Sequence, residues 1–192
     1  MKTAYLTRKE GAFSQRLALR FREAGYEVVF EPQKGVEFFV DLTCGPVPGD
    51  DRAAGEGIDA GAAEEAYRRI VCGPLLKLEK VFPDMTGKKR ICFLASRSSS
   101  VNWSEAERGY GENMARAALY QILTITKNTR LKDGYTFRLF DPMEGEADPE
   151  KAADAAFVYF TRDRYDDGPD NPGRNDEGNL LVRDARGREI PW

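Results

Sequence analysis

The sequence predicts an α/β protein built on a mostly parallel sheet of about six strands. Three observations support this prediction. The chain opens with an apolar segment, an amphipathic helix and a second apolar segment, which is the order of a βαβ unit. Segments typical of strands and of helices then alternate along the chain. No internal repeat or linker-like composition divides the 192 residues, so we expect one domain spanning residues 1–192.

The opening βαβ unit has clear boundaries. Residues 2–7 are apolar and bounded by charge, as expected of a strand. Residues 12–26 place apolar side chains at helical spacing, and Gly25 ends the helix because glycine readily adopts the left-handed conformation found there. Residues 27–31 form a second strand, closed by Pro32. A helix between two strands of these lengths indicates that the strands run parallel.

The next strand follows too soon for another crossover helix. Only the four residues of "PQKG", 32–35, precede the strand at 36–42, whereas a parallel crossover needs about a dozen residues. The residues alone leave two alternatives open. The new strand is antiparallel, or the chain crosses the end of the sheet and re-enters on the far side of the first strand.

A long helix is predicted at residues 62–85. Gly73 and Pro74 lie in its middle and predict a kink or a local irregularity, because proline lacks the N–H that a helix interior requires. The segments that alternate with the helices are strands at 89–96, 135–142 and 180–184, and loops at 43–61 and 164–179.

Two more helices are predicted in the second half of the chain. Residues 104–129 form the longer one, with Ser104 or Asn102 as its N-cap. Residues 148–163 form the other, with Asp148 as its cap and proline at its first position.

The composition excludes several classes of function. The net charge of −3 and the pI near 5.3 give no basic surface for nucleic acid. No apolar run approaches the roughly 18 residues of a membrane span, and the start of the chain lacks the apolar core of a signal peptide. We therefore expect a cytoplasmic protein without nucleic-acid or membrane partners. Histidine is absent, which excludes His-based triads, His metal ligands and His general bases.

Metal and disulfide sites are not expected. Cys44, Cys72 and Cys92 form an odd, scattered set, which indicates reduced and mostly buried thiols rather than a disulfide framework or a zinc site. The acidic loop at 164–179 has the composition of a calcium loop but not the EF-hand spacing, so we predict a solvated loop.

The ordered segments of the chain resemble the short-chain dehydrogenase/reductase family over nearly the whole length. The similar segments are the βαβ at 2–31, the helix and strand at 72–96, the helix and strand at 110–142, and the last helix and strand at 148–160 and 178–184. The resemblance implies a Rossmann-like, doubly wound sheet. The family has a helix, a strand and another helix where this chain has "PQKG". The resemblance therefore implies that the usual third strand and its flanking helices are missing, and the antiparallel alternative becomes unnecessary.

The resemblance also assigns catalytic positions. Ser96 matches the family's catalytic Ser at the end of its strand, where it hydrogen-bonds a substrate carbonyl. Tyr110 matches the catalytic Tyr that exchanges the proton. Met114 falls where the family has a Lys that binds the nicotinamide ribose, and an uncharged thioether cannot replace that cation.

The cofactor loop departs from the family as well. The family's TGxxxGxG loop lets backbone N–H groups approach a pyrophosphate at a helix N-terminus. Here only Thr7 matches, and Gly11 is out of register, while Phe13 and a glutamate crowd or repel a diphosphate. Arg8 and Ser14 complete this degenerate loop.

Our prediction is therefore a dehydrogenase-like protein that has lost NAD(P) binding and hydride transfer and binds no cofactor. It acts as a structural or regulatory subunit, associating with itself or with an active paralogue through the helices at 62–85 and 104–129. In this reading Ser96 and Tyr110 are vestigial. The alternative is an oxidoreductase using NAD(P), or a cofactor-independent lyase or isomerase, that uses these two residues on a small carbonyl or hydroxy substrate. A third hypothesis is a small-molecule binding module lined by Trp103, Tyr110 and Tyr120.

Overall fold

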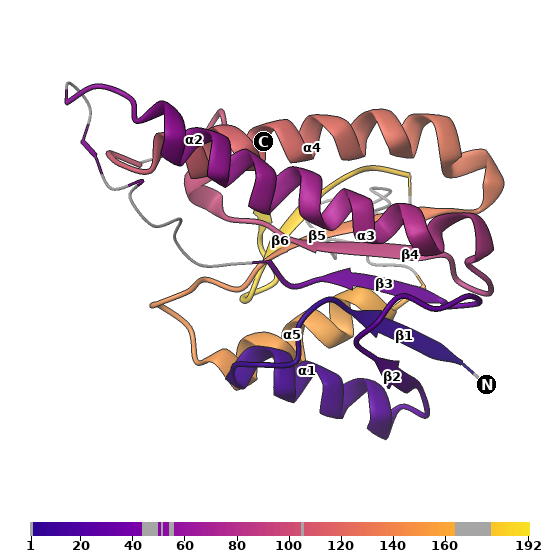
Figure 1. Ribbon diagram of the computed structural model, residues 1–192. Coiled ribbons are helices and arrows are strands. Elements are labelled where there is room, and N and C mark those ends of the chain that lie inside the picture. The colour runs from indigo at the N-terminus through magenta and orange to yellow at the C-terminus, as the bar shows by residue number, and fades with distance from the viewer. Residues whose placement is uncertain (1, 44–49, 51, 54–55, 105, 164–177) are drawn as a thin grey trace.

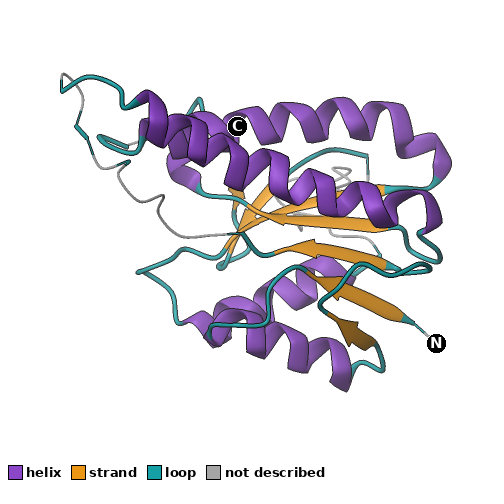
Figure 2. Ribbon diagram, in the orientation of Figure 1, coloured by secondary structure: helices purple, strands orange, loops and turns teal. Residues whose placement is uncertain are grey.

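The computed structural model describes residues 2–43, 50, 52–53, 56–104, 106–163 and 178–192. It has three layers, with a central sheet between two layers of helices (Figures 1 and 2). The helices are α1 (Ala12–Glu23), α2 (Ala60–Tyr67), α3 (Gly73–Val81), α4 (Tyr110–Arg130) and α5 (Pro149–Thr161). The strands are β1 (Thr3–Leu6), β2 (Glu27–Val29), β3 (Phe38–Asp41), β4 (Arg90–Leu94), β5 (Thr136–Asp141), β6 (Val182–Asp184) and β7 (Glu189–Ile190).

The sheet has the order β2-β1-β3-β4-β5-β6-β7, and its first six strands are parallel. This confirms the Rossmann-like, mostly parallel sheet, with one strand more than the six expected. The additional strand is β7, a two-residue strand that pairs antiparallel with β6. It was missed because two residues carry no periodic pattern, and only the partner strand reveals them.

The short link at 32–35 carries the chain from the edge of the sheet to the other side of β1. Both β2 and β3 pair with β1 in parallel, with Ala4 opposite Val28 on one side and Phe38 on the other. The crossing alternative is therefore confirmed, and the antiparallel one is wrong. Among the described residues no strand lies beyond β2, as expected if the usual third strand is missing.

Helix boundaries agree with the sequence where local signals decide them. Gly25, with φ of 83°, follows the end of α1. The Asp148 carboxylate accepts hydrogen bonds from the backbone N–H groups of Glu150 and Lys151 at the start of α5. The irregularity expected at Gly73-Pro74 is present as a π-helical turn, Arg68–Cys72, which separates α2 from α3.

The start of α4 differs from the prediction. The helix begins at Tyr110, and Gly109 in a left-handed conformation precedes it, so neither Ser104 nor Asn102 is the cap. The hydroxyl of Ser104 instead donates to the carbonyl of Ser98. The N-terminus of α4 is capped from a distant loop: the Asp50 carboxylate accepts from the N–H of Gly111 at 3.0 Å and of Glu112 at 2.6 Å.

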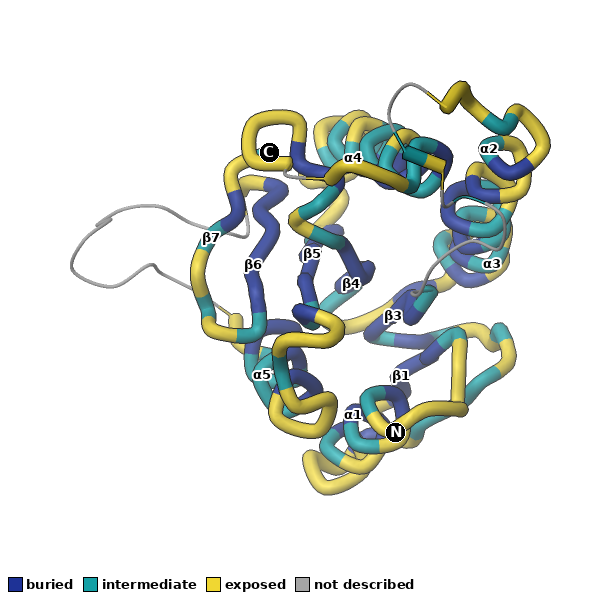
Figure 3. The backbone as a smooth tube through the Cα atoms, turned by 90° about the vertical axis from the view of Figure 1, so that its left-hand side faces the viewer, coloured by how far each residue is buried: buried dark blue, intermediate teal, exposed yellow. Residues whose placement is uncertain are grey.

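The sheet separates two hydrophobic cores, and its strands are buried throughout β1 and β3–β5 apart from Thr136 at the start of β5 (Figure 3). Neighbouring strand residues face opposite sides, so Phe39 packs in the core beneath α2–α4, whereas Phe38 packs in the core against α1 and α5. Edge-to-face aromatic pairs, such as Phe21 with Phe38 at 5.3 Å, reinforce the second core.

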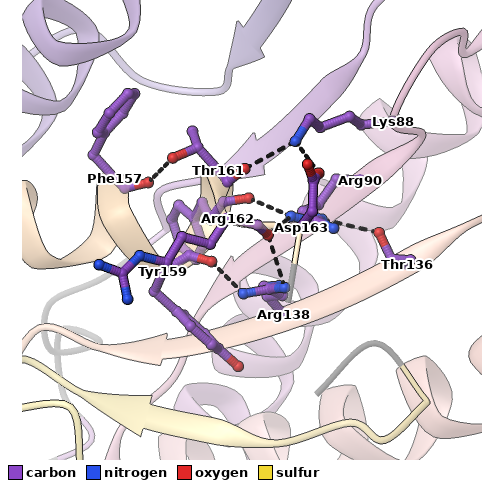
Figure 4. Close-up of polar contacts among 10 residues, drawn as sticks. Lys88, Arg90, Thr136, Arg138, Phe157, Tyr159, Thr161, Arg162 and Asp163 are labelled. Carbon is purple, nitrogen blue, oxygen red and sulfur yellow. Dashed lines mark hydrogen bonds and ion pairs between the residues drawn. The ribbon is translucent and has the colours of Figure 1, made fainter. Parts of the chain in front are cut away.

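Three cations converge on the C-terminal end of α5, where backbone carbonyls lack helical partners (Figure 4). Lys88 donates to the carbonyl of Thr161 at 3.0 Å. Arg90 donates to the carbonyls of Phe160 at 2.9 Å and Arg162 at 2.5 Å. Arg138 donates to the carbonyls of Tyr159 and Arg162. These contacts fasten α5 to β4 and β5.

Candidate functional site

A pocket lies at the carboxyl ends of β4 and β5, beside the first turns of α4, which is where open parallel sheets usually bind ligands. We call it the polar pocket. Its volume is ≈ 290 Å³. Hydroxyl and charged side chains dominate its lining, chiefly those of Ser96, Ser98, Arg97, Glu112, Arg116, Asp141, Glu144 and Glu146.

Ser96 lies where the sequence placed it. It follows β4 in an extended conformation, and its hydroxyl is 2.7 Å from that of Ser98 in the polar pocket. It also accepts a weak hydrogen bond from the N–H of Ser98 at 3.4 Å. The hydroxyl is therefore oriented by a local turn and faces the pocket.

Tyr110 and Met114 are not brought together with Ser96. Neither is among the residues that line the polar pocket, and 58% of Met114 is exposed on the outer face of α4. The helix presents Glu112 and Arg116 to the pocket instead. Each lies two residues further along the chain, which turns a side chain by about 200° around the helix axis. The assignment of Tyr110 as a catalytic residue stays a prediction.

Glu112 and Arg116 form an ion pair within the pocket. The Nε of Arg116 donates to Glu112 Oε1 at 3.0 Å. Arg116 is only 5% exposed. Sequence reasoning missed both residues, although they have the same four-residue spacing as Tyr110 and Met114. The signal that could have found them is the buried stripe of Ala115, Leu119 and Leu123, which fixes the sheet-facing side of α4.

Asp141 closes the pocket at the end of β5. Its two carboxylate oxygens accept from the N–H groups of Met143 at 2.7 Å and Arg97 at 2.9 Å. Burial raises the pKa of Asp141, and these hydrogen bonds oppose that shift. The carboxylate therefore joins the loops after β4 and β5 into one wall.

The predicted cofactor loop forms a second pocket, which we call the first-loop pocket. Arg8, Gly11 and Ser14 line it, together with Phe13 and Pro142. Its volume is ≈ 250 Å³, below the roughly 300–1,000 Å³ that encloses a drug-sized ligand. The Phe13 ring lies inside this loop, with its centroid 6.5 Å from that of Phe140.

Thr7 has a structural partner. Its hydroxyl donates to Asp41 Oδ1 at 2.9 Å and accepts from the N–H of Leu42 at 3.0 Å. Thr43 also donates to Asp41. Burial raises the pKa of Asp41, against the lowering effect of these hydrogen bonds. This network ties the first loop to the end of β3.

The three aromatic residues considered for a small-molecule cleft do not share one pocket. Tyr120 stacks on Trp192 with ring centroids 4.7 Å apart, and its hydroxyl donates to the carbonyl of Leu180. Trp103 lines a separate pocket of ≈ 330 Å³, which adjoins the polar pocket through Arg97 and Ser98.

An open apolar groove of ≈ 520 Å³ runs between α3 and α4. Leu75, Leu76, Phe82 and Ile122 line it, and Cys72 lies at its edge. Leu76 and Ile125 are exposed on these helices. The predicted assembly helices therefore carry an apolar surface.

Within the described part of the chain there is no cluster of three or more potential metal ligands. Cys92 is buried and Cys72 half-buried, and both are free thiols. Cys44 and the acidic loop lie outside the described residues, except for Gly178 and Asn179 at the end of that loop. None of the helices that the structure describes combines the length and the apolar character needed to cross a membrane.

The fold is similar to solved structures of reductases and dehydrogenases. A carbonyl reductase from Pseudomonas aeruginosa PAO1 in complex with NADP has a TM-score of 0.77 at 13% identity, over 100% of both chains. A putative short-chain alcohol dehydrogenase from Burkholderia multivorans has a TM-score of 0.75 at 12% identity, over 100% of this chain and 99% of that one. The putative carbonyl reductase Sniffer of Caenorhabditis elegans has a TM-score of 0.73 at 8% identity, over 100% of this chain and 99% of that one.

At these identities the likeness establishes the fold alone. No protein-family model matches the sequence, and no curated protein matches it. Because the alignments run over nearly all of both chains, they do not show that this chain is shortened relative to these structures.

Proposed function

We propose that this chain is a short-chain dehydrogenase/reductase-like protein that has lost NAD(P)-dependent hydride transfer and acts as a structural or regulatory subunit. The observation that carries the proposal is the Glu112–Arg116 pair. These residues line the polar pocket, whereas Tyr110 and Met114, at the positions where the family resemblance calls for a tyrosine and a lysine, do not. An ionised carboxylate accepts hydrogen bonds but has no proton to give to a carbonyl substrate.

The first-loop pocket supports the same conclusion. A pyrophosphate is bound by backbone N–H groups at a helix N-terminus, and glycines permit its close approach. Here Phe13 and Glu10 line the space that the phosphates need.

A cytoplasmic location, expected from the sequence, stays a prediction.

The groove between α3 and α4 supports assembly. Its apolar side chains gain stability when another surface removes them from water. We propose that a second copy of the chain, or an active paralogue, packs on this groove around Leu76 and Ile125.

Two measurements test the proposal. Calorimetric titration with NAD(H) and NADP(H) is expected to give no binding, and the mass in solution is expected to exceed that of one chain. Leu76→Asp should reduce the mass to that of a single chain, whereas Val101→Asp, at another exposed apolar position, should not. A dinucleotide affinity in the micromolar range would overturn the loss of cofactor binding. If the mass in solution is that of a single chain, self-association is contradicted, and only assembly with an active paralogue remains.

The alternative enzyme reading is supported by the position of Ser96 in the polar pocket. The Pseudomonas neighbour, solved with NADP, also supports this reading. An oxidoreductase would bind NAD(P), whereas a lyase or isomerase would act without it. In either case Tyr110→Phe and Ser96→Ala must abolish the activity, and retention of activity by both variants excludes this mechanism.

A further inference from the structure

Arg116 is a buried cation with unused donor capacity. Only its Nε is hydrogen-bonded to a described residue, Glu112. Its Nη atoms are not among the fully buried nitrogens that lack a partner, so they keep access to solvent through the polar pocket. Because guanidinium groups present several fixed donors, a ligand in the pocket can accept from the Nη atoms without disturbing the ion pair.

Acceptors lie beside these donors. The second carboxylate oxygen of Glu112 and the carboxylate of Glu144 accept no hydrogen bond from any described residue, and Glu144 lines the same pocket. The paired hydroxyls of Ser96 and Ser98 can either donate or accept. A ligand that matches this wall must carry donors and acceptors at close spacing.

The net charge of the pocket selects against anions. Four carboxylates and two guanidinium groups line it, which leaves an excess of two negative charges. An anionic ligand would be repelled by this excess, and a simple amine would leave the Arg116 donors unused. A ligand with adjacent hydroxyl groups can accept from the Arg116 donors and donate to the carboxylates, because each hydroxyl donates one hydrogen bond and accepts others.

The neighbouring pocket supplies an apolar surface. Trp103 lines it and is half-exposed, and Arg97 and Ser98 form the wall common to both pockets. An indole face packs well against the C–H face of a ring that carries hydroxyls at its edge. We propose that the polar pocket binds a neutral polyhydroxylated molecule of about monosaccharide size, with Arg116, Glu112 and Ser98 as its hydrogen-bonding groups.

The first experiment compares ligand classes. Glucose and myo-inositol are titrated into the protein by calorimetry and ligand-observed NMR, beside citrate, inorganic phosphate and putrescine. We expect saturable binding of at least one of the two polyols, and weaker or no binding of the charged probes. Tighter binding of citrate, phosphate or putrescine overturns the proposal, as does the absence of binding by both polyols.

The second experiment locates the site. Arg116→Lys keeps the charge but loses the planar donor pair, and we expect affinity for the polyol to fall about tenfold to a hundredfold. Arg130→Lys is the matched control, because Arg130 lies at the far end of the same helix and pairs with exposed Asp133; this variant should bind the polyol as the parent does. Unchanged affinity in a folded Arg116→Lys protein contradicts the proposal.

If Arg116→Lys does not fold, Ser98→Ala and Glu144→Gln take its place. Each removes one pocket group at a loop position, and at least one must weaken polyol binding about tenfold. Retention of full affinity by both also contradicts the proposal. The proposal does not depend on the loss of hydride transfer, because dinucleotide titration tests that loss separately.

Discussion

Buried arginines on the two faces of the sheet have different surroundings. Beside α5, Arg90 and Arg138 donate to backbone carbonyls of the helix end. Beside α4, Arg116 is similarly buried, yet its one hydrogen bond to a described residue is to a carboxylate on its own helix. The first pair joins two layers of the fold, whereas Arg116 forms no hydrogen bond to a described residue outside α4 and lines the polar pocket.

This difference separates a structural role from a binding role. A buried guanidinium whose donors reach main-chain acceptors replaces the lost hydration and fixes the geometry. A buried guanidinium whose Nη atoms meet only pocket space retains donors for a ligand. Burial and charge, considered alone, do not distinguish the two.

The largest expected effect is on the α5 side. Arg138 is 1% exposed, so Arg138→Met should leave the carbonyls of Tyr159 and Arg162 without this donor. We expect a loss of about 3 kcal/mol in the free energy of unfolding, measured by urea denaturation. Arg116→Met should cost about 1 kcal/mol or less, because Glu112 remains accessible to water through the pocket. Equal losses in the two variants would remove the distinction between the two sites.

A smaller effect is expected from the backbone beneath the pocket. Gly111 lies against α2, and a Cβ at this position would be 2.6 Å from the Cα of Ala63. Gly111→Ala should therefore cost about 2 kcal/mol in unfolding free energy and shift the N-terminus of α4. An unchanged unfolding free energy in Gly111→Ala would show that α2 and α4 can separate freely.

The smallest expected effect is a pH dependence at Asp141. Burial raises its pKa in the folded protein above the ordinary value of about 3.9. The stability that this group contributes is then fully present below that ordinary value and is lost as the pH rises through the raised pKa. The unfolding free energy of the parent should therefore fall relative to that of Asp141→Asn as the pH rises above about 4.

Asp154 provides the opposite sign as a control. Its hydrogen bond and ion pair with Arg16 lower its pKa. Its contribution is present above the ordinary pKa and is lost as the pH falls, so the parent should lose stability in acid relative to Asp154→Asn. Matching pH profiles for the two asparagine variants would contradict the assignment of opposite shifts.

Much of the fold could be predicted from local signals. The βαβ opening, the irregularity at Gly73-Pro74 and the Asp148 cap all depend on neighbours within a few residues. The crossing at 32–35 could be predicted because its length excludes a crossover helix. The start of α4 could not, because its capping carboxylate, Asp50, is about sixty residues away along the chain.

The candidate site likewise combines features that local sequence predicts with features that tertiary packing decides. The sequence by itself determined that Ser96 follows a buried strand, that the chemistry uses no histidine and that the first loop lacks the glycines of the family it resembles. Only the tertiary structure decided that Glu112 and Arg116, rather than Tyr110 and Met114, face the pocket. A four-residue spacing fixes which side chains share a face of a helix, but packing against the sheet determines which of those faces points inward.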